Sequence, residues 1–315
     1  LFIDGYGYAY VFTGLTRPWE RNMAYSFHKY KTFNSHFTLE FVLKIQREYN
    51  YPLWMGESGE NSNAWATDAV KLFEDIGIGW SWWTYKKLGS VTNPVSFNSN
   101  SRYDALVSYI KGESSSKPTL DNIYAGLLEL AESTKIENVN FQRDYIDALV
   151  RQPYSNLTVP YSNNKVPGTI YASNFDLGNN LNAYYDTNSY DFEYSTGTYQ
   201  ASNSFIYRND GVDVNSTTFS AGNGFCIEHI DKGEWAVYTI NVENDGLYDI
   251  GIFFSSTSNS GKISLEINGI PINSNMPLGN SGDYDRFIEK KLEKIQLNSG
   301  INTVSYTHLT LPTKA

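Results

Sequence analysis

The chain has 315 residues, a formal net charge of −10 and a sequence pI of about 4.9, without any block of Lys or Arg. This length is enough for two domains that each bury a core. The charge argues against nucleic acid and anionic membrane surfaces as partners, because both need a basic footprint.

One cysteine, Cys226, leaves no intrachain disulfide and is expected to be a small core residue. No run of about 18 apolar residues is present, so the sequence predicts no membrane span. Residues 1–4 already have a strand pattern, and we therefore expect the chain to begin within a fold. The lack of a signal peptide then carries no information on export.

Apolar strand patterns alternate with amphipathic helix patterns up to about residue 112. The expected strands are 1–4, 23–30, 52–57 and 77–85, and the expected helices are 39–49, 65–75 and 103–111. Strands that are apolar throughout and separated by helices predict a parallel sheet covered on both faces. Four such units are half of a (β/α)8 barrel. A doubly wound sheet gives the same alternation, but we find no Gly-rich phosphate loop.

The second half of the chain has a different pattern. Helices at 121–132 and 141–151 are expected to pack on the outside of the barrel, and the Pro- and Asn-rich residues 153–165 predict a linker. From residue 166, short alternating strands punctuated by Gly, Asn and Asp predict an all-β sandwich. The clearest of these strands are 234–242, 248–254 and 262–267.

Residues 304–313 differ in sequence pattern from the rest of the chain. VSYTHLTLPT at 304–313 resembles the translated read-through of a transposase sequencing adapter, with an ordinary terminal strand as the alternative. We therefore expect 304–315 to be a non-native tail. The expected regions are a half barrel at 1–112, a helical extension packed on it at 113–152, a linker at 153–165, a sandwich at 166–303 and the tail.

The tetrad Gly56-Glu57-Ser58-Gly59 places a carboxylate at the end of a buried strand. In parallel barrels, the carboxyl ends of the strands form the active-site face. An aromatic segment with Trp80, Trp82 and Trp83 follows one helix later. A carboxylate beside indole rings suits hydrolysis of a glycosidic bond, since the charge meets an oxocarbenium-like transition state and the flat rings hold sugars.

Side chains on the neighbouring strand are placed to assist Glu57. By strand alternation, His28 and Tyr30 share one face at the end of their strand. A neutral His there can bind a sugar hydroxyl, and the Tyr hydroxyl can donate to the carboxylate of Glu57. The alternative for His28 is a core imidazole bound to a backbone carbonyl.

Alternation also divides the aromatic segment into two sets. Trp80 and Trp82 face one side and Trp83 the other, and one set must fill the interface with the outer helices. We select Trp83 as the sugar platform because it lies nearer the end of the strand. Lys86 is within reach of a sugar hydroxyl beside it, with a solvated lysine as the alternative.

The segments 22–30 (NMAYSFHKY), 53–63 (LWMGESGENSN) and 79–83 (GWSWW) together resemble glycoside hydrolase family 5 over roughly residues 1–112. Its members are retaining enzymes on a (β/α)8 barrel, often endo-β-1,4-glucanases. The resemblance implies that Glu57 is the nucleophile and that the chain starts at barrel strand five. The general acid/base would then lie before Leu1, and we expect this chain alone to be inactive.

The segments 183–187 (AYYDT), 207–214 (YRNDGVDV) and 233–239 (GEWAVYT) resemble carbohydrate-binding module family 6, over about residues 166–303. Such modules are jelly-roll β-sandwiches that hold glycans between aromatic rings, usually with a structural calcium. The resemblance implies Phe225 and Tyr284 as the aromatic pair. Residues 170–173 (IYAS) replace the usual acidic residues, which argues against calcium, and the adapter-like tail would replace the last strand with its sugar-binding Asn.

The sequence therefore predicts a secreted or cell-surface retaining β-glycanase that acts on β-glucan or a related plant polysaccharide. We expect a monomer. We also expect no catalytic cofactor or metal, because the four His residues are scattered without ligand spacing. An esterase is disfavoured because there is no Gly-x-Ser-x-Gly motif. The alternative from another class is a non-catalytic polysaccharide-binding protein with a decayed barrel.

Overall fold

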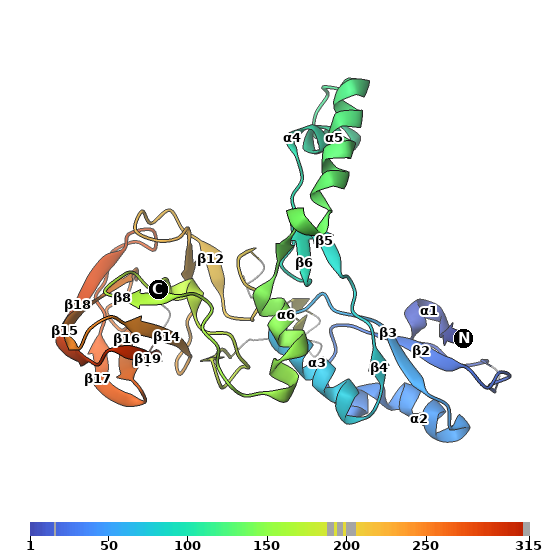
Figure 1. Ribbon diagram of the computed structural model, residues 1–315, viewed down its shortest axis with the longest axis horizontal. Helices are drawn as coiled ribbons and strands as arrows, with labels where there is room; N and C mark the ends of the chain where they lie inside the picture. Colours follow the sequence, from blue (N-terminus) through green and yellow to red (C-terminus); the bar gives the residue numbers. More distant parts are fainter. Residues whose placement is uncertain (16, 188–191, 194–197, 200–205, 311–315) are drawn as a thin grey trace.

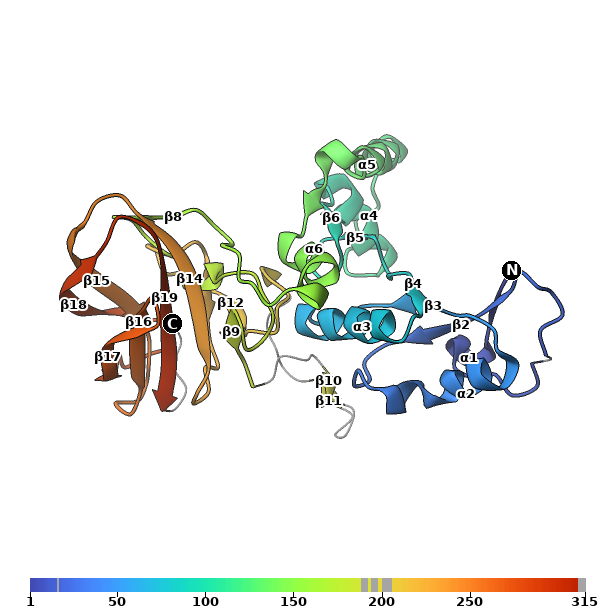
Figure 2. The ribbon, with the colours of Figure 1, turned by 60° about the horizontal axis from the view of Figure 1, so that its bottom comes forward.

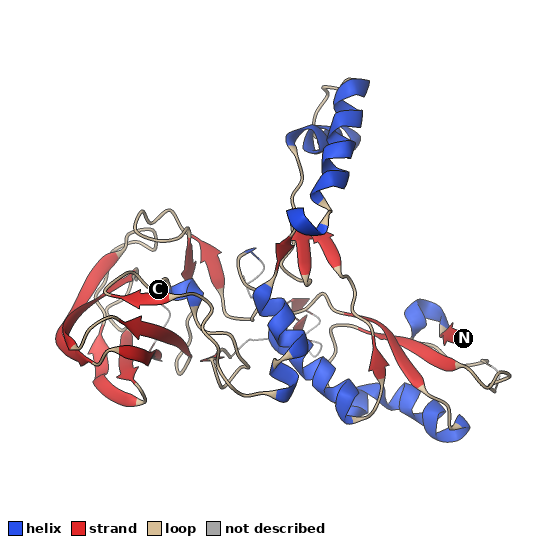
Figure 3. Cartoon of the chain, viewed as in Figure 1, coloured by secondary structure: helices blue, strands red, loops and turns tan. Residues whose placement is uncertain are grey.

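The computed structural model describes residues 1–15, 17–187, 192–193, 198–199 and 206–310. A region of mixed helices and strands lies at one end of an elongated molecule, and a region built almost only of strands lies at the other (Figures 1 and 3). In the described ranges, no helix combines the length and apolarity needed to cross a membrane.

The described N-terminal residues form a four-stranded, all-parallel sheet in the order β1-β2-β3-β4. Its strands are β1 (Phe2–Asp4), β2 (Ala24–Lys29), β3 (Leu53–Ser58) and β4 (Gly79–Trp80), and its main helices are α2 (Glu40–Tyr49) and α3 (Asn63–Asp75). Short helices α1 (Tyr6–Ala9) and η1 (His36–Leu39) follow β1 and β2. The predicted parallel α/β arrangement is confirmed, and the strand order follows the chain without a reversal.

Apolar side chains of the sheet pack against α2 and α3. Phe27 of β2 and Met55 of β3 are fully buried beside Phe73 of α3 and Val42 of α2. Each such side chain contributes about 1.5–3 kcal/mol on leaving water. Because one face of the sheet is covered in this way, the carboxyl ends of the strands are held at a common edge.

The predicted strand 77–85 is shorter than expected. Strand β4 covers only Gly79–Trp80, although the backbone N–H groups of Ser81 and Trp83 still donate to β3 carbonyls, at 2.9 and 2.7 Å. The peptide bond between Trp83 and Thr84 is cis. Trp80 and Trp82 form an edge-to-face pair at 6.0 Å on the helix side, as alternation predicts.

The helical extension differs from its prediction in one helix. Helix α6 (Arg143–Val150) packs on α3, whereas α5 (Leu120–Ser133) packs on α4 (Ser101–Ile110), and this pair projects away from the sheet (Figures 1 and 2). A small sheet carries the pair, made of β5 (Lys86–Leu88), β6 (Val95–Phe97) and β7 (Asn140–Phe141), with η2 (Ile136–Asn138) before β7. Helical periodicity identifies an apolar face but not the element that covers it, which is why the position of α5 was not predictable.

The expected linker is partly structured. Its start continues η3 (Gln152–Tyr154), and its last residues enter β8 (Asn164–Val166), which pairs in parallel with β14. Between them, the guanidinium of Arg143 donates to the carbonyl oxygen of Tyr161 at 2.9 Å. Residues 153–165 therefore contact both the helical extension and the strands of the C-terminal region.

The C-terminal region is a β-sandwich. Among the described residues, one sheet has the order β17-β16-β19-β14-β8 with β9 also on β14, and it faces two two-stranded sheets, β15 with β18 and β12 with β13. Alternating burial along β14 and β15 places every second side chain in the core. Its strands are β9 (Tyr184–Tyr185), β12 (Val214–Ser216), β13 (Phe225–Ile227), β14 (Trp235–Val242), β15 (Gly246–Phe254), β16 (Lys262–Ile267), β17 (Ile270–Pro277), β18 (Ile288–Leu297) and β19 (Gly300–Thr310), and η4 (Ala172–Asn174) precedes them. Strands β10 (Phe192–Glu193) and β11 (Thr198–Tyr199) pair with each other in a separate two-stranded sheet.

The predicted boundary at residue 303 falls inside β19. This strand runs over Gly300–Thr310 and pairs with both β14 and β16, and the side chain of His308 is fully buried. The structure therefore gives 304–310 the position of an ordinary strand, which was the alternative. Residues 311–315 of the expected tail lie outside the described residues, and the adapter origin of the segment stays a prediction.

A buried polar network joins the two regions. One carboxylate oxygen of Asp144 accepts from the side-chain amide of Asn63 and from the backbone N–H of Asn209, each at 2.8 Å. Asn63 N–H donates to the carbonyl of Asn209 at 2.6 Å, and Asp210 contacts both Asn63 and Arg208. All five side chains are at most 2% exposed. Because buried polar groups are costly without partners, this network fixes how the regions meet.

Candidate functional site

Glu57 lies at the carboxyl end of β3, where an irregularity turns its side chain toward β2. Phe27 pairs with Met55 and the next residue, His28, pairs with Glu57, so Gly56 is an extra residue in β3. A Cβ at Gly56 would lie 2.4 Å from the hydroxyl oxygen of Ser26, so only glycine fits. Such bulges re-aim side chains at functional edges, and here the bulge sets Glu57 directly opposite His28.

The structure brings together the three predicted residues His28, Tyr30 and Glu57. His28 Nδ1 lies 3.3 Å from Glu57 Oε2, and the Tyr30 hydroxyl donates to the same oxygen at 3.2 Å. Burial, followed by the charge of Glu57, raises the pKa of Tyr30. The phenol therefore stays protonated and remains a hydrogen-bond donor to the carboxylate, whose side chain is 35% exposed.

Trp83 lies beside this cluster and presents its ring to solvent, with the residue 48% exposed. The backbone N–H of Trp83 donates to the backbone carbonyl of Ser58, the residue after Glu57, at 2.7 Å. Gly59 has a φ of 141°, and a Cβ there would lie 2.1 Å from the carbonyl oxygen of Trp83. Close packing of these backbones holds the backbone of Trp83 beside Ser58 and Gly59, the residues that follow Glu57. An exposed aromatic face at this edge can hold a sugar ring.

Two charged residues near the cluster have other partners. The ammonium of Lys86 donates to the backbone carbonyl of Thr134, at the end of α5. This contact favours a structural role for Lys86, and its contact with sugar stays a prediction. Glu60 forms an ion pair with Lys87 at 2.8 Å. Among the described residues, Glu57 thus contacts His28 and Tyr30, whereas Glu60 is engaged by Lys87.

One unusual group near the site was not predicted. Lys29, next to His28 but on the opposite face of β2, is 2% exposed, and its ammonium donates to Thr32 and lies 4.8 Å from the ring centre of Trp65. Burial lowers the pKa of Lys29 to about 7. The sequence offers one signal for it, since alternation places this lysine on the helix-facing side.

The predicted aromatic pair of the sandwich is not joined by a ring contact in the described part of the chain. Phe225 stacks on Tyr207 at 4.4 Å, and the Tyr207 hydroxyl donates to the side chain of Asn174 at 2.6 Å. Tyr284 is 43% exposed, and its hydroxyl accepts from Thr257 at 3.1 Å. Sugar contacts by either ring stay predictions.

A second aromatic cluster in the sandwich was missed. Phe219 lies 4.7 Å from Phe287 and 5.3 Å from Phe253 between ring centres. Phe253 occupies an outward position of β15, where alternation predicts a polar residue, and this is the signal that could have found the cluster.

The described residues give no support for a metal site. They contain no group of three His, Cys, Asp or Glu side chains that could hold an ion. Both carboxylate oxygens of Asp176, near the start of the sandwich, already accept from Thr239, at 2.9 and 2.6 Å. Asp176 is therefore already engaged by protein donors, and calcium in the sandwich stays a doubtful prediction.

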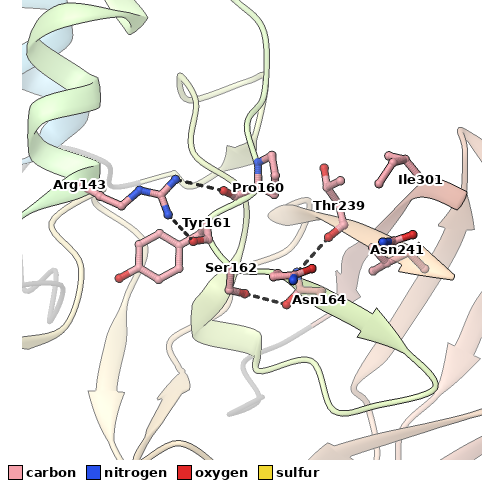
Figure 4. Close-up of a pocket in the computed structure, with 10 residues that line it drawn as sticks. Arg143, Pro160, Tyr161, Ser162, Asn164, Thr239, Asn241 and Ile301 are labelled. Atoms are coloured by element: carbon pink, nitrogen blue, oxygen red, sulfur yellow. Dashed lines mark hydrogen bonds between the residues drawn. The ribbon is translucent and has the colours of Figure 1, made fainter. Parts of the chain in front are cut away.

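A pocket of about 290 Å³ lies where α6 meets the sandwich (Figure 4). Arg143, Tyr161, Asn164 and Thr239 are among the residues that line it. Figure 4 shows that these groups bind one another: Arg143 donates to Tyr161, and the Asn164 amide donates to the carbonyl of Thr239 at 3.0 Å. The pocket is therefore part of the junction between the regions rather than a preformed ligand site.

Comparison with known proteins assigns one part of the chain. Residues 204–310 match the model of carbohydrate binding module family 6. No curated protein sequence matches the chain.

Similar solved structures include a family 6 module from Clostridium stercorarium in complex with cellobiose, at 14% identity, covering 49% of this chain and 92% of that one with a TM-score of 0.33. A module of a Cellvibrio mixtus lichenase in complex with cellotriose is 20% identical, with coverages of 33% and 80% and a TM-score of 0.29. A β-1,3-glucan-binding module from Bacillus halodurans is 20% identical, with coverages of 33% and 81% and a TM-score of 0.28. These scores are low, so the assignment depends on the family model. By that match, residues 204–310 are a carbohydrate-binding module of family 6.

Proposed function

We propose that the chain is part of a retaining β-glycanase, most closely an endo-β-1,4-glucanase, with Glu57 as the nucleophile. The observation that carries the proposal is the carboxylate of Glu57 at the end of a parallel strand, bound through one oxygen by both His28 and Tyr30. A retaining enzyme needs one carboxylate oriented for attack on the anomeric carbon. The contacts with Tyr30 and His28 restrain that orientation, and the exposed ring of Trp83 supplies a surface for the sugar.

Two further observations support the proposal. The strand order β1-β2-β3-β4 follows the chain, as in the wall of a (β/α)8 barrel, whereas a doubly wound sheet reverses its order. The family 6 match at 204–310 supports binding of a polysaccharide by the same chain. In this proposal the module holds β-glucan or a related plant polysaccharide, and Glu57 attacks it.

The test uses 2-deoxy-2-fluoro-β-cellobiosyl fluoride, because fluoride leaves without being protonated. The carboxylate of Glu57 attacks C1, the C1–F bond breaks, fluoride departs, and a glycosyl ester forms. We expect intact-mass spectrometry to show one added fluorocellobiosyl group, mapped by peptide analysis to Glu57. Glu57→Gln should abolish the labelling, and Glu60→Gln is the matched control that should retain it.

The alternative function, a polysaccharide-binding protein without catalysis, is favoured by the module alone. Under that alternative the chain would bind soluble β-glucan in an affinity gel but remain unlabelled by the fluoride at millimolar concentration. Labelling at a residue other than Glu57 would also contradict the proposal.

A further inference from the structure

The carboxyl edge of the parallel sheet carries a row of groups in strand order. The loop after β1 lies at one end. His28 follows on β2 with Tyr30 just after that strand, Glu57 lies on β3, and Trp83 lies beyond β4. Neighbouring strands are about 4.8 Å apart, so the row spans roughly 14 Å. That length suits an oligosaccharide rather than one sugar, with Glu57 inside the row and not at its end.

The loop after β1, residues 5–11, has an unusual backbone. Gly7, Tyr8 and Ala9 have φ values of 61°, 59° and 58°, three successive residues in the left-handed region. This conformation costs about 1–2 kcal/mol for each non-glycine residue. Tyr6 and Val11 close the loop with two backbone hydrogen bonds of 3.0 Å each. Strain of this kind is retained mainly where a functional geometry requires it.

The loop is tied to the Glu57 cluster through one side chain. The hydroxyl of Tyr10 accepts from the backbone N–H of Tyr30 at 3.3 Å, and Tyr30 in turn donates to Glu57. The strained turn therefore lies next to the cluster. Its Tyr8 ring is 88% exposed, the same value as Phe37 and more than Trp83. An aromatic ring that a strained turn holds in solvent at this edge is available to stack on a ligand.

We propose that Tyr8 is a sugar platform on the opposite side of Glu57 from Trp83, so that a β-linked glucan crosses the edge of the sheet and is cut internally. This inference rests on the proposed function and adds to it a second sugar-binding surface and the direction in which the glucan crosses the sheet. Tyr8 determines affinity for longer oligosaccharides, whereas Trp83 holds the ring next to the bond that breaks.

The experiment measures how well oligosaccharides protect Glu57 from 2-deoxy-2-fluoro-β-cellobiosyl fluoride. Labelling reports only this site, so sugar bound to the family 6 module does not interfere. In the unsubstituted chain, cellotetraose should protect at lower concentration than cellobiose. Tyr8→Ala should raise the protection constant of cellotetraose about tenfold, the effect of losing about 1.4 kcal/mol, and should leave that of cellobiose within twofold.

Two control variants make the result specific. Tyr8→Phe keeps the ring, and cellotetraose should protect this variant at the same concentration as the unsubstituted chain. Tyr124→Ala removes another exposed tyrosine, 67% exposed and on α5, and should leave both protection constants unchanged. An unchanged cellotetraose constant in Tyr8→Ala would overturn the inference while the proposed function stands. Failure of the unsubstituted chain to be labelled would overturn the proposed function, and this inference with it.

Discussion

His28 at the end of β2 and Tyr30 just after it both contact the same carboxylate oxygen of Glu57, and they differ in how constantly they donate a hydrogen bond. Tyr30 is a fixed donor at 3.2 Å because burial raises its pKa, whereas His28, at 3.3 Å, donates only from a ring nitrogen that carries a proton. The tyrosine is therefore the more constant of the two contacts.

Tyr30→Phe should slow labelling of Glu57 by the fluoride about ten- to a hundredfold. The lost bond is to a charged group, which is worth about 1.5–3 kcal/mol, and each 1.36 kcal/mol is tenfold in rate. The rate is read by intact-mass spectrometry over time. Tyr124→Phe, a hydroxyl removed from the exposed surface of α5, is the control, and equal rates for both variants would show that the Tyr30 contact does not assist attack.

Lys29 makes the stability of the protein depend on pH. Below pH 7 both the folded and unfolded chains hold its proton. Between about pH 7 and the usual value of 10.5 only the unfolded chain does, because burial lowers the folded pKa to about 7. The free energy of unfolding should therefore rise with pH in this window, by at most about 1.4 kcal/mol per pH unit.

Urea unfolding at pH 7.0, 8.0 and 9.0 tests this expectation. Lys29→Met should lose most of the rise, since it places an apolar chain of similar length beside Trp65. Lys71→Met removes a lysine that is exposed and paired with Asp75, and it should keep the slope of the unsubstituted chain. If Lys29→Met and the unsubstituted chain have the same pH slope, the buried lysine is not its source.

At the scale of the element, the bulge in β3 is the feature that positions the site. Gly56 contributes an extra residue to the strand, and its missing side chain leaves room for Ser26 on β2. The bulge thus couples the packing of two strands to the direction of Glu57.

Gly56→Ala should destabilise the protein by about 1–3 kcal/mol, the usual cost of overpacking, and should slow labelling of Glu57 because the bulge shifts. Ser26→Ala removes the atom that a Cβ would meet at 2.4 Å, so the double variant should recover much of the stability. Chemical denaturation of the two single variants and the double variant measures the coupling. Simple additivity would mean that the contact with Ser26 is not the cause.

On the scale of the whole molecule, the polar network at the junction makes the two regions depend on each other. Asn63 lies in α3 of the α/β region and Asp144 in α6 of the helical extension, whereas Asn209 lies in the segment before β12 of the sandwich. We therefore expect the protein to unfold in a single cooperative transition. The sequence had instead predicted two domains joined by a linker, which would unfold separately.

Asp144→Ala should split or broaden this transition in differential scanning calorimetry. The change leaves two buried donors, on Asn63 and Asn209, without their acceptor, at about 1–3 kcal/mol each. Asp121→Ala, in the first turn of the projecting helix α5, is the matched control and should leave the transition single. Two separate transitions in the unsubstituted chain would contradict the expected coupling.

Much of the local structure follows from the sequence because residue periodicity reports which face is buried. Alternation and helical spacing placed β2, β3, α2 and α3 to within two residues. The meeting of His28, Tyr30 and Glu57 was also predictable, because the carboxyl ends of parallel strands share one edge. Aromatic content added the expectation that Trp83 lies nearby.

Other features depended on contacts between segments far apart in the chain. Periodicity did not show that α5 packs on α4 rather than on the sheet, that 304–310 completes the sandwich as part of β19, or that Lys86 binds a carbonyl of Thr134. The strained turn at Tyr8 and the network around Asp144 were likewise absent from any local pattern. In each case the sequence alone determined which face of an element is apolar or polar, and only the tertiary structure decided which partner meets that face, because partners are selected by shape and hydrogen bonding across the whole fold.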